Sequence, residues 1–147
     1  MDLFANTAAA SYYVTVKSMK LSTPGSTDTK SYDIGGSFVA SLDSGSSSNL
    51  LPPGLGAKVC ADLKGTMSSA GSTCRVDCAV RQQTGGMTFE LDGKSILVPY
   101  NNLINEELFQ ETSSCFLMIS DNTVFVDPPT HILGGEFCLW LLFQEGT

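Results

Sequence analysis

The sequence predicts an all-β domain with antiparallel, barrel-like pairing and one short helix. Eight or so short runs of β-branched, aromatic or alternating residues are separated by clusters of Gly, Pro, Ser and Asp. Asp92-Gly93 stands between two alternating runs, which is the strongest hairpin signal in the chain. With 147 residues, of which 42% are hydrophobic, residues 1–147 are expected to form a single domain with a real core.

The first elements are predicted from local patterns. Ser11–Leu21 is rich in β-branched and aromatic residues and is predicted to be a strand. Residues 22–31 form a Ser/Thr-rich loop, and a short strand over Ser31–Ile34 ends at a pair of glycines. Phe38–Asp43 is the next strand, and it ends on an acidic residue.

One helix is predicted over Gly54–Leu63. Leu55, Val59 and Leu63 recur every four residues, which places them on one face, and Gly65 provides a stop.

The second half contains more strands, with no internal repeat and no domain boundary. Strands are predicted at Thr73–Val80, Met87–Leu91, Ser95–Pro99, Cys115–Ser120 and Val124–Val126. A dense apolar run, His131–Phe143, closes the sequence.

The net charge of −7 argues against nucleic acid or an anionic membrane as a partner, because both repel an acidic surface. It suits an environment of low pH, where some carboxylates are neutral. No apolar stretch approaches the roughly 20 residues of a membrane span, so no membrane span is predicted.

Five cysteines in an acidic, Lys-poor chain indicate an oxidising compartment, hence a secreted, extracellular or vacuolar protein, with the cell surface also open. A local Cys60–Cys74 bridge is plausible across a Gly/Ser-rich stretch, which would leave Cys78 free to reach Cys115. Four cysteines allow three connectivities, and Cys138 is left over.

The stretch FVASLDSGSSSNLLPP, residues 38–53, carries the functional hypothesis. An apolar strand runs into a single Asp43 that is surrounded by small hydroxyls and a glycine. A β-turn is one interpretation, because Asp, Ser and Gly are turn residues. The other is a carboxylate held by hydroxyl and backbone donors, which is half of an aspartic-protease active site.

The order of the motifs supports the second interpretation. YYVTVKSM precedes the strand into D-S-G-S-S and L-P; a helix, V-D-C, FELDGKSILVPY, a Cys-led strand and I-L-G-G-x-F follow. Over about residues 11–138 this order resembles the C-terminal lobe of a pepsin-like (family A1) aspartic protease, most of all secreted or cell-surface fungal members, including the yapsin group. The resemblance implies one half of a bilobal fold.

The resemblance also implies roles for the loop. Asp43 matches the catalytic aspartate of the D-[ST]-G motif, and Ser44 matches the hydroxyl that reaches across to the other lobe. Gly45 lets the backbone pass close to the carboxylate, and Ser46 matches a hydroxyl that hydrogen-bonds an aspartate oxygen.

Ile132-Leu133-Gly134 matches the segment that crosses beneath the active-site loop. Cys78 and Cys115 stand where the lobe disulfide joins its two strands. The sequence departs from the family pattern at Gly135, where an aspartate is usual.

Peptide hydrolysis of this kind needs two carboxylates, one activating a water and one protonated to polarise the carbonyl. Asp33-Ile34-Gly35 lacks the second-position hydroxyl and lies too near Asp43, so it is predicted to be a turn. The second aspartate must therefore come from an N-terminal lobe on another chain or from a second copy. The assembly would cleave peptides at acidic pH and bind pepstatin-like inhibitors, whereas the isolated chain is expected to be inactive.

No metal or organic cofactor is implied, because the nucleophile is water. A Ser-His-Asp hydrolase would use Asp43, His131 and one of Ser46–Ser48, but no G-x-S-x-G elbow is present. A zinc site from Cys74, Cys78 and His131 lacks a fourth ligand. A non-catalytic, pepsin-fold binding or inhibitor-like protein is the alternative function.

Overall fold

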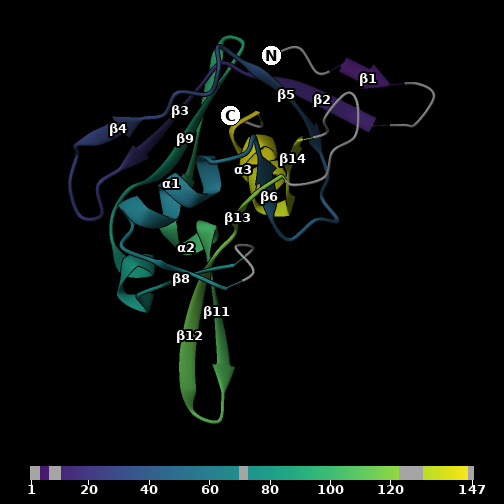
Figure 1. The fold of residues 1–147 in the computed structure, drawn as a ribbon. Helices are drawn as coiled ribbons and strands as arrows, with labels where there is room; N and C mark the ends of the chain where they lie inside the picture. The colour runs from purple at the N-terminus through teal and green to yellow at the C-terminus, as the bar shows by residue number, and fades with distance from the viewer. Residues whose placement is uncertain (1–3, 7–10, 70–72, 123–130, 146–147) are drawn as a thin grey trace.

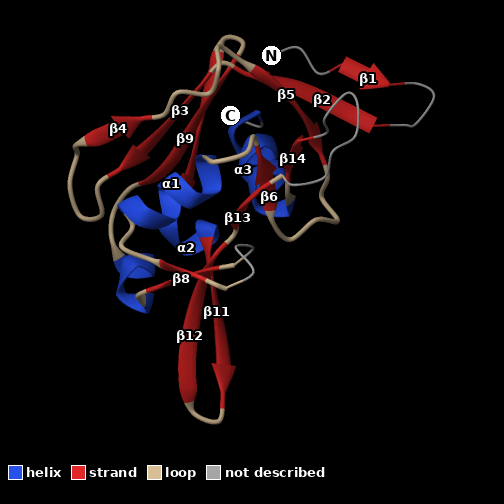
Figure 2. Ribbon diagram, in the orientation of Figure 1, coloured by secondary structure: helices blue, strands red, loops and turns tan. Residues whose placement is uncertain are grey.

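The computed structural model describes residues 4–6, 11–69, 73–122 and 131–145, and it confirms that the fold is mostly β (Figure 1). Its strands form three sheets, and short helices pack between and beside them (Figure 2). The predicted strand Val124–Val126 lies outside the described residues. No helix in the described part is long and apolar enough to cross a membrane.

A six-stranded sheet positions the Asp43 loop. Its order is β1 (Phe4–Asn6), β2 (Ser11–Val16), β5 (Phe38–Leu42), β14 (His131–Leu133), β6 (Asn49–Leu51) and β13 (Ile119–Asp121). Strand β14 lies between the two strands that flank the loop, parallel to β5 and antiparallel to β6. Because parallel strands end at the same edge of a sheet, β14 finishes beside Asp43.

A second sheet supplies much of the core. Its order is β10 (Lys94–Pro99), β9 (Gly86–Leu91), β3 (Ser18–Ser22) and β4 (Thr29–Ser31). The β9–β10 hairpin confirms the Asp-Gly prediction, with Gly93 at a φ of 78°, which suits a glycine. The short strand β4 overlaps the predicted strand over Ser31–Ile34 only at Ser31, so that prediction is largely wrong; the next backbone N–H, of Tyr32, still donates to the carbonyl of Met19 on β3 (3.0 Å).

The single predicted strand over Ser11–Leu21 is wrong, because the chain divides there between two sheets. Strand β2 buries Val14 and Val16, whereas β3 buries Met19 and Leu21. The alternation therefore shifts phase between positions 16 and 19, and the backbone N–H of Lys17 at the break donates to the carbonyl of Glu90 (2.7 Å).

The third sheet has the order β11 (Ile104–Phe109), β12 (Thr112–Leu117), β8 (Cys74–Val76) and β7 (Thr66–Met67). Figure 1 shows the β11–β12 hairpin projecting from the body of the lobe. The predicted strand over Thr73–Val80 ends early, because Asp77 caps a 3-10 helix, η1 (Cys78–Gln82), by accepting the N–H of Ala79 (2.9 Å). The strand predicted over Cys115–Ser120 is likewise split between β12 and β13.

The helix predicted over Gly54–Leu63 is confirmed as α1 (Leu55–Asp62), but the expectation of a single helix is wrong. A short helix α2 (Tyr100–Leu103) and a longer one, α3 (Gly135–Glu145), are also present. Within the uniformly apolar run of α3, the helical period is hidden. Phe137 and Leu141, four residues apart, are buried, and Phe137 packs edge-on against Phe89 of β9 (5.2 Å between ring centroids).

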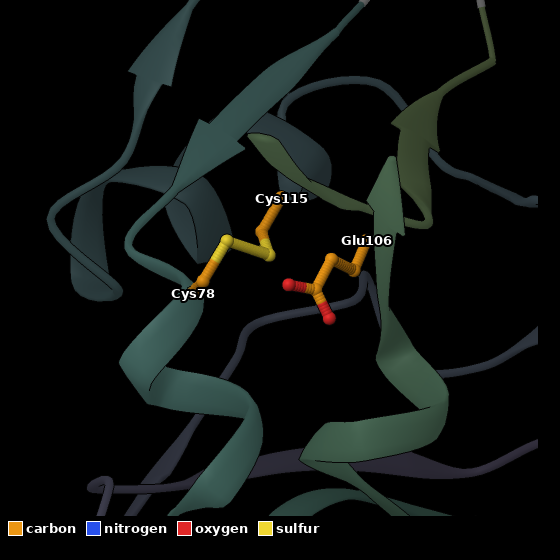
Figure 3. A group of neighbouring side chains, drawn as sticks. All are labelled: Cys78, Glu106 and Cys115. Carbon is orange, nitrogen blue, oxygen red and sulfur yellow. A yellow bond between two sulfur atoms is a disulfide. The ribbon is translucent and has the colours of Figure 1, made fainter. Parts of the chain in front are cut away.

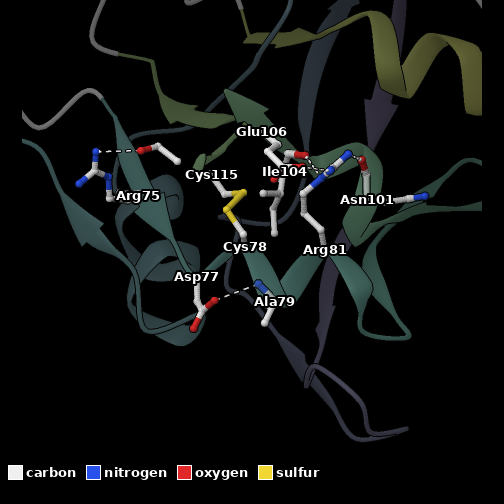
Figure 4. The surroundings of a disulfide bond; sticks show 10 residues. Arg75, Asp77, Cys78, Ala79, Arg81, Asn101, Ile104, Glu106 and Cys115 are labelled. Atoms are coloured by element: carbon white, nitrogen blue, oxygen red, sulfur yellow. Dashed lines mark hydrogen bonds and ion pairs between the residues drawn. A yellow bond between two sulfur atoms is a disulfide. The ribbon is translucent and has the colours of Figure 1, made fainter. Parts of the chain in front are cut away.

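The two disulfides join Cys60 to Cys74 and Cys78 to Cys115, the pairs named from the sequence. The first ties α1 to β8, and the second ties η1 to β12 beside the guanidinium of Arg81 (Figure 4). Trp140 packs partly buried against the core.

His131 gives the fold a pH dependence. Burial lowers its pKa, because the interior disfavours the imidazolium, whereas an unfolded histidine titrates near ~6.5. The imidazole of His131 therefore binds a proton more tightly in the unfolded chain than in the folded one. The stability that neutral His131 contributes is present above about pH 6.5 and is lost as the pH falls toward the lowered folded pKa.

We therefore expect His131→Gln to lose less unfolding free energy than the wild type between pH 7.5 and pH 5. Urea titrations at both pH values measure the difference, and carboxylates that titrate at low pH affect both proteins alike. Equal losses in the two proteins would show that His131 is not responsible.

Candidate active site

The carboxylate of Asp43 is held by the backbone of its own loop. Its Oδ1 accepts the N–H of Gly45 (3.0 Å), while the N–H of Asp43 donates to the carbonyl of Leu133 on β14 (3.0 Å). The side chain is exposed. Its backbone is thus anchored to the neighbouring strand, and its carboxylate stays accessible to a reactant.

Gly134 and Gly135, which directly follow β14, let the chain approach the backbone of the Asp43 loop closely. A Cβ on Gly134 would lie 2.7 Å from the carbonyl oxygen of Ser48 and 2.8 Å from that of Ser46, too close for any side chain. The N–H of Gly135 donates to the same Ser46 carbonyl (2.8 Å). The Leu133-Gly134 segment therefore packs directly against the backbone of the loop over residues 43–48.

Asn49 is a residue of this site that the sequence analysis missed. Its side chain is buried, with 3% exposed; its Oδ1 accepts the N–H of Gly134 (2.8 Å), and its Nδ2 donates to the carbonyl of Met118 (3.1 Å). It therefore joins β6, β14 and the segment leading into β13. The sequence pattern that could have identified it is an asparagine directly before two leucines of a predicted apolar segment, because a buried amide needs hydrogen-bond partners.

The contacts of the loop serines differ in part from the roles that the resemblance implies. The hydroxyl of Ser46 donates to the carbonyl of Ser48 (3.1 Å), so its single proton is not directed at the Asp43 carboxylate. The backbone N–H of Ser46 donates to the carbonyl of Asp43 (3.1 Å), which closes the turn. Ser44 is exposed at the tip of the loop.

Cys138, which forms no disulfide, lies next to the Asp43 loop. Its thiol donates to the carbonyl of Leu133 (3.6 Å), the carbonyl that also accepts the Asp43 N–H. Burial and the negative charge of Asp43 both raise the pKa of this thiol, against weaker opposing backbone hydrogen bonds. The thiol is therefore held in its neutral form.

An open pocket of about 570 Å³ lies beside the loop. Residues 44–47 form one wall, and Arg81, Asn101 and Glu136 contribute to the others. The side-chain amide of Asn102 donates to the Glu136 carboxylate (2.8 Å), which connects α2 to the start of α3.

Asp33 makes the same turn contact as Asp43, so this contact alone does not distinguish a candidate active site from a turn. Its Oδ1 accepts the N–H of Gly35 (2.9 Å), almost the same contact that Asp43 makes with Gly45. The turn prediction is confirmed. What Asp43 has in addition is the anchoring of its own N–H to β14.

The alternative sites are not formed. His131 lies inside the six-stranded sheet, where its ring meets Phe38 (5.3 Å between ring centroids) and its Nδ1 lies 3.4 Å from the amide of Asn122. Cys74 and Cys78 belong to different disulfides, so they are not free to bind zinc.

Figure 3 shows Glu106 beside the Cys78–Cys115 disulfide, with one possible ligand atom from each residue within 4.8 Å of the others. Bonded sulfurs are not thiolate ligands. Glu106 is instead paired with Arg81 (2.9 Å; Figure 4), so this group is structural.

A family model described as "Eukaryotic aspartyl protease" matches residues 3–141. The chain belongs to this family. A search of curated proteins finds no match.

Among solved structures, the chain is similar to the crystal structure of an aspartic proteinase from Irpex lacteus. The TM-score is 0.62 at 17% sequence identity, over 90% of this chain and 38% of that chain. At this identity the likeness shows the fold. The chain thus spans well under half the length of that proteinase.

We expect Asn49→Ala to destabilise the chain by about 1–3 kcal/mol, because the buried N–H of Gly134 would lose its acceptor, whereas the Met118 carbonyl would still accept the backbone N–H of residue 49. Urea unfolding at pH 7 measures the loss. Asn105→Ala, at an exposed position, is the matched control and should change stability by less than about 0.5 kcal/mol. A similar small change in both variants would contradict the role assigned to Asn49.

Proposed function

We propose that this chain is one lobe, equivalent to the C-terminal lobe, of a secreted aspartic endopeptidase. The observation that carries the proposal is the exposed carboxylate of Asp43, whose backbone is fixed to Leu133 above the Gly134 segment. This geometry presents an acid toward a reactant on a rigid support. Membership in the aspartyl protease family supports peptide hydrolysis as the chemistry.

The reaction needs a second aspartate opposite Asp43. Two carboxylates at close range cannot both be ionised, so the pair shares one proton. The ionised member takes a proton from water as the water oxygen attacks the peptide carbonyl, and the protonated member donates to the carbonyl oxygen. Return of a proton to the amide nitrogen then allows the C–N bond to break.

The second aspartate would come from an N-terminal lobe or from a second copy of the chain. The proteinase from Irpex lacteus is long enough to contain considerably more than the part that matches here, which supports a missing lobe. The hydroxyl of Ser44, exposed at the loop tip, would contact the opposite loop, and Gly45 would keep the carboxylate reachable. Ser46, Ile132 and the Leu133-Gly134 segment would support the loop from below.

The two disulfides suit a secreted, extracellular or vacuolar location, including a fungal cell surface, since such bonds persist in oxidising compartments. The net charge of −7 suits an acidic working pH, because protonation reduces self-repulsion. The substrates would be peptides or proteins, and pepstatin-like inhibitors would bind the assembled site.

Asp43→Asn in the assembled protease should lower kcat for an acid-denatured protein substrate by at least about 1000-fold, because the dyad loses one carboxylate. Asp33→Asn is the matched control, since Asp33 makes the same local turn contact without the β14 support. It should retain activity within about twofold. An Asp43→Asn protein that still cleaves, or a wild-type assembly that binds a partner without cleaving it, would favour the non-catalytic alternative.

The isolated chain should cleave no peptide at any pH between 3 and 7. Native mass spectrometry, with identification of any chain that co-purifies, tests the source of the second aspartate. A monomer of 15.6 kDa that hydrolyses peptides or binds pepstatin tightly would refute the one-lobe proposal.

A further inference from the structure

Strand β11 is an exposed sheet edge that adjoins the pocket beside the catalytic loop. It is the terminal strand of the third sheet, and every residue from Asn105 to Phe109 is exposed. Asn105 and Ile104, at its start, line the same pocket as residues 44–47 of the Asp43 loop. The strand then runs outward along the projecting hairpin (Figure 1).

The direction of the backbone groups follows from the pairing. The carbonyl of Leu103 accepts the N–H of Met118, toward β12, so the next residue faces the other way. The carbonyl of Ile104 indeed accepts from Nε of Arg81 (3.0 Å), outside the hairpin. By the same alternation, the N–H and C=O groups of Glu106 and Leu108 point outward, where another strand can pair with them.

The side chains of β11 repeat one pattern on both faces. On one face Glu106 is followed by Leu108, and on the other Glu107 is followed by Phe109. Leu108 and Phe109 are 71% and 74% exposed, the highest values among the large apolar residues of the described part. Each face therefore offers one acid and, further out, one apolar contact.

A second copy of the chain is a poor occupant. Antiparallel pairing of two β11 strands that sets Glu106 against Leu108 places Glu107 opposite Glu107 of the other copy. Shifting the register inward sets Glu106 against Glu106. Like charges directly opposite each other destabilise a strand pair, and only a short overlap at the hairpin tip avoids them.

The charge of the hairpin selects a basic partner. Residues 104–117 contain three glutamates and no Lys or Arg. Arg81 pairs with Glu106 (2.9 Å), which leaves Glu107 and Glu111 as the remaining acids, on a chain with a net charge of −7.

We propose that the outer edge of β11 binds an extended polypeptide segment in which two adjacent apolar residues precede a basic residue. Antiparallel addition sets the apolar pair beside Leu108 and Phe109 and the basic residue beside Glu107, the acid of this strand that Arg81 does not pair with. The segment would gain backbone hydrogen bonds from the edge and side-chain contacts on both faces. Its basic end would lie toward the pocket beside the Asp43 loop.

The test measures binding to the whole chain and is independent of catalysis. The probe is a fluorescein-labelled eight-residue peptide with the core Val-Val-Lys, and its partner probe has the core Val-Val-Glu. Fluorescence anisotropy at pH 7 and low salt should show affinity at least tenfold higher for the lysine peptide. Equal affinity for the two peptides, or no binding of either, would overturn the proposal.

Two variants separate edge pairing from general damage to the hairpin. Leu108→Pro removes an outward N–H on the β11 side and should weaken binding at least tenfold. Ser113→Pro removes the outward N–H of the residue paired with Leu108, on the opposite edge of the same hairpin, and should leave binding within twofold. Equal losses in both variants, with circular dichroism unchanged, would overturn the proposal.

A charge exchange provides a test that does not touch the backbone. Glu107→Lys should weaken binding of the lysine peptide at least threefold. Asp92→Lys, the same charge change on the other exposed hairpin, should change it by less than twofold. A mass that doubles with concentration and returns to that of the monomer in Leu108→Pro would instead assign the edge to a second copy.

Discussion

The position of β14 between β5 and β6 is the constraint on which the rest of the site depends. Its Leu133 carbonyl holds the Asp43 backbone from one side, and its Gly134 N–H is held by the buried amide of Asn49 from the other. The glycine is required because carbonyls of the loop lie where a side chain would be. The orientation of the carboxylate is thus a property of three strands together.

The polar groups around this support have separate tasks. The Asn49 amide satisfies backbone groups in the interior, where an unpaired group is costly. The loop outside it keeps its carboxylate and hydroxyls accessible. The Cys78–Cys115 disulfide and the Arg81–Glu106 pair lie further away and hold η1 against the third sheet. The residues that hold the loop in place, such as buried Asn49, are therefore different from the exposed residue, Asp43, whose carboxylate solvent can reach.

The features that could be predicted from the sequence are those with a local signature. The Asp92-Gly93 hairpin, helix α1 and the turn at Asp33 follow from short patterns of residues. The division between β2 and β3 and the helix α3 were missed, because the first depends on a phase shift and the second on a face hidden in an apolar run. The contacts of Asn49 and the acceptor of the Ser46 hydroxyl depend on groups brought together only by folding.

The parallel pairing of β14 with β5 has a consequence for how the molecule is made. His131 pairs with Ala40, about ninety positions earlier in the chain, so the loop acquires its support only when nearly the whole lobe has left the ribosome. Contacts this distant in sequence form slowly, since a large loop must close first. Until then the backbone of Asp43 lacks the Leu133 carbonyl that accepts its N–H, and the loop lies on an unsupported strand end.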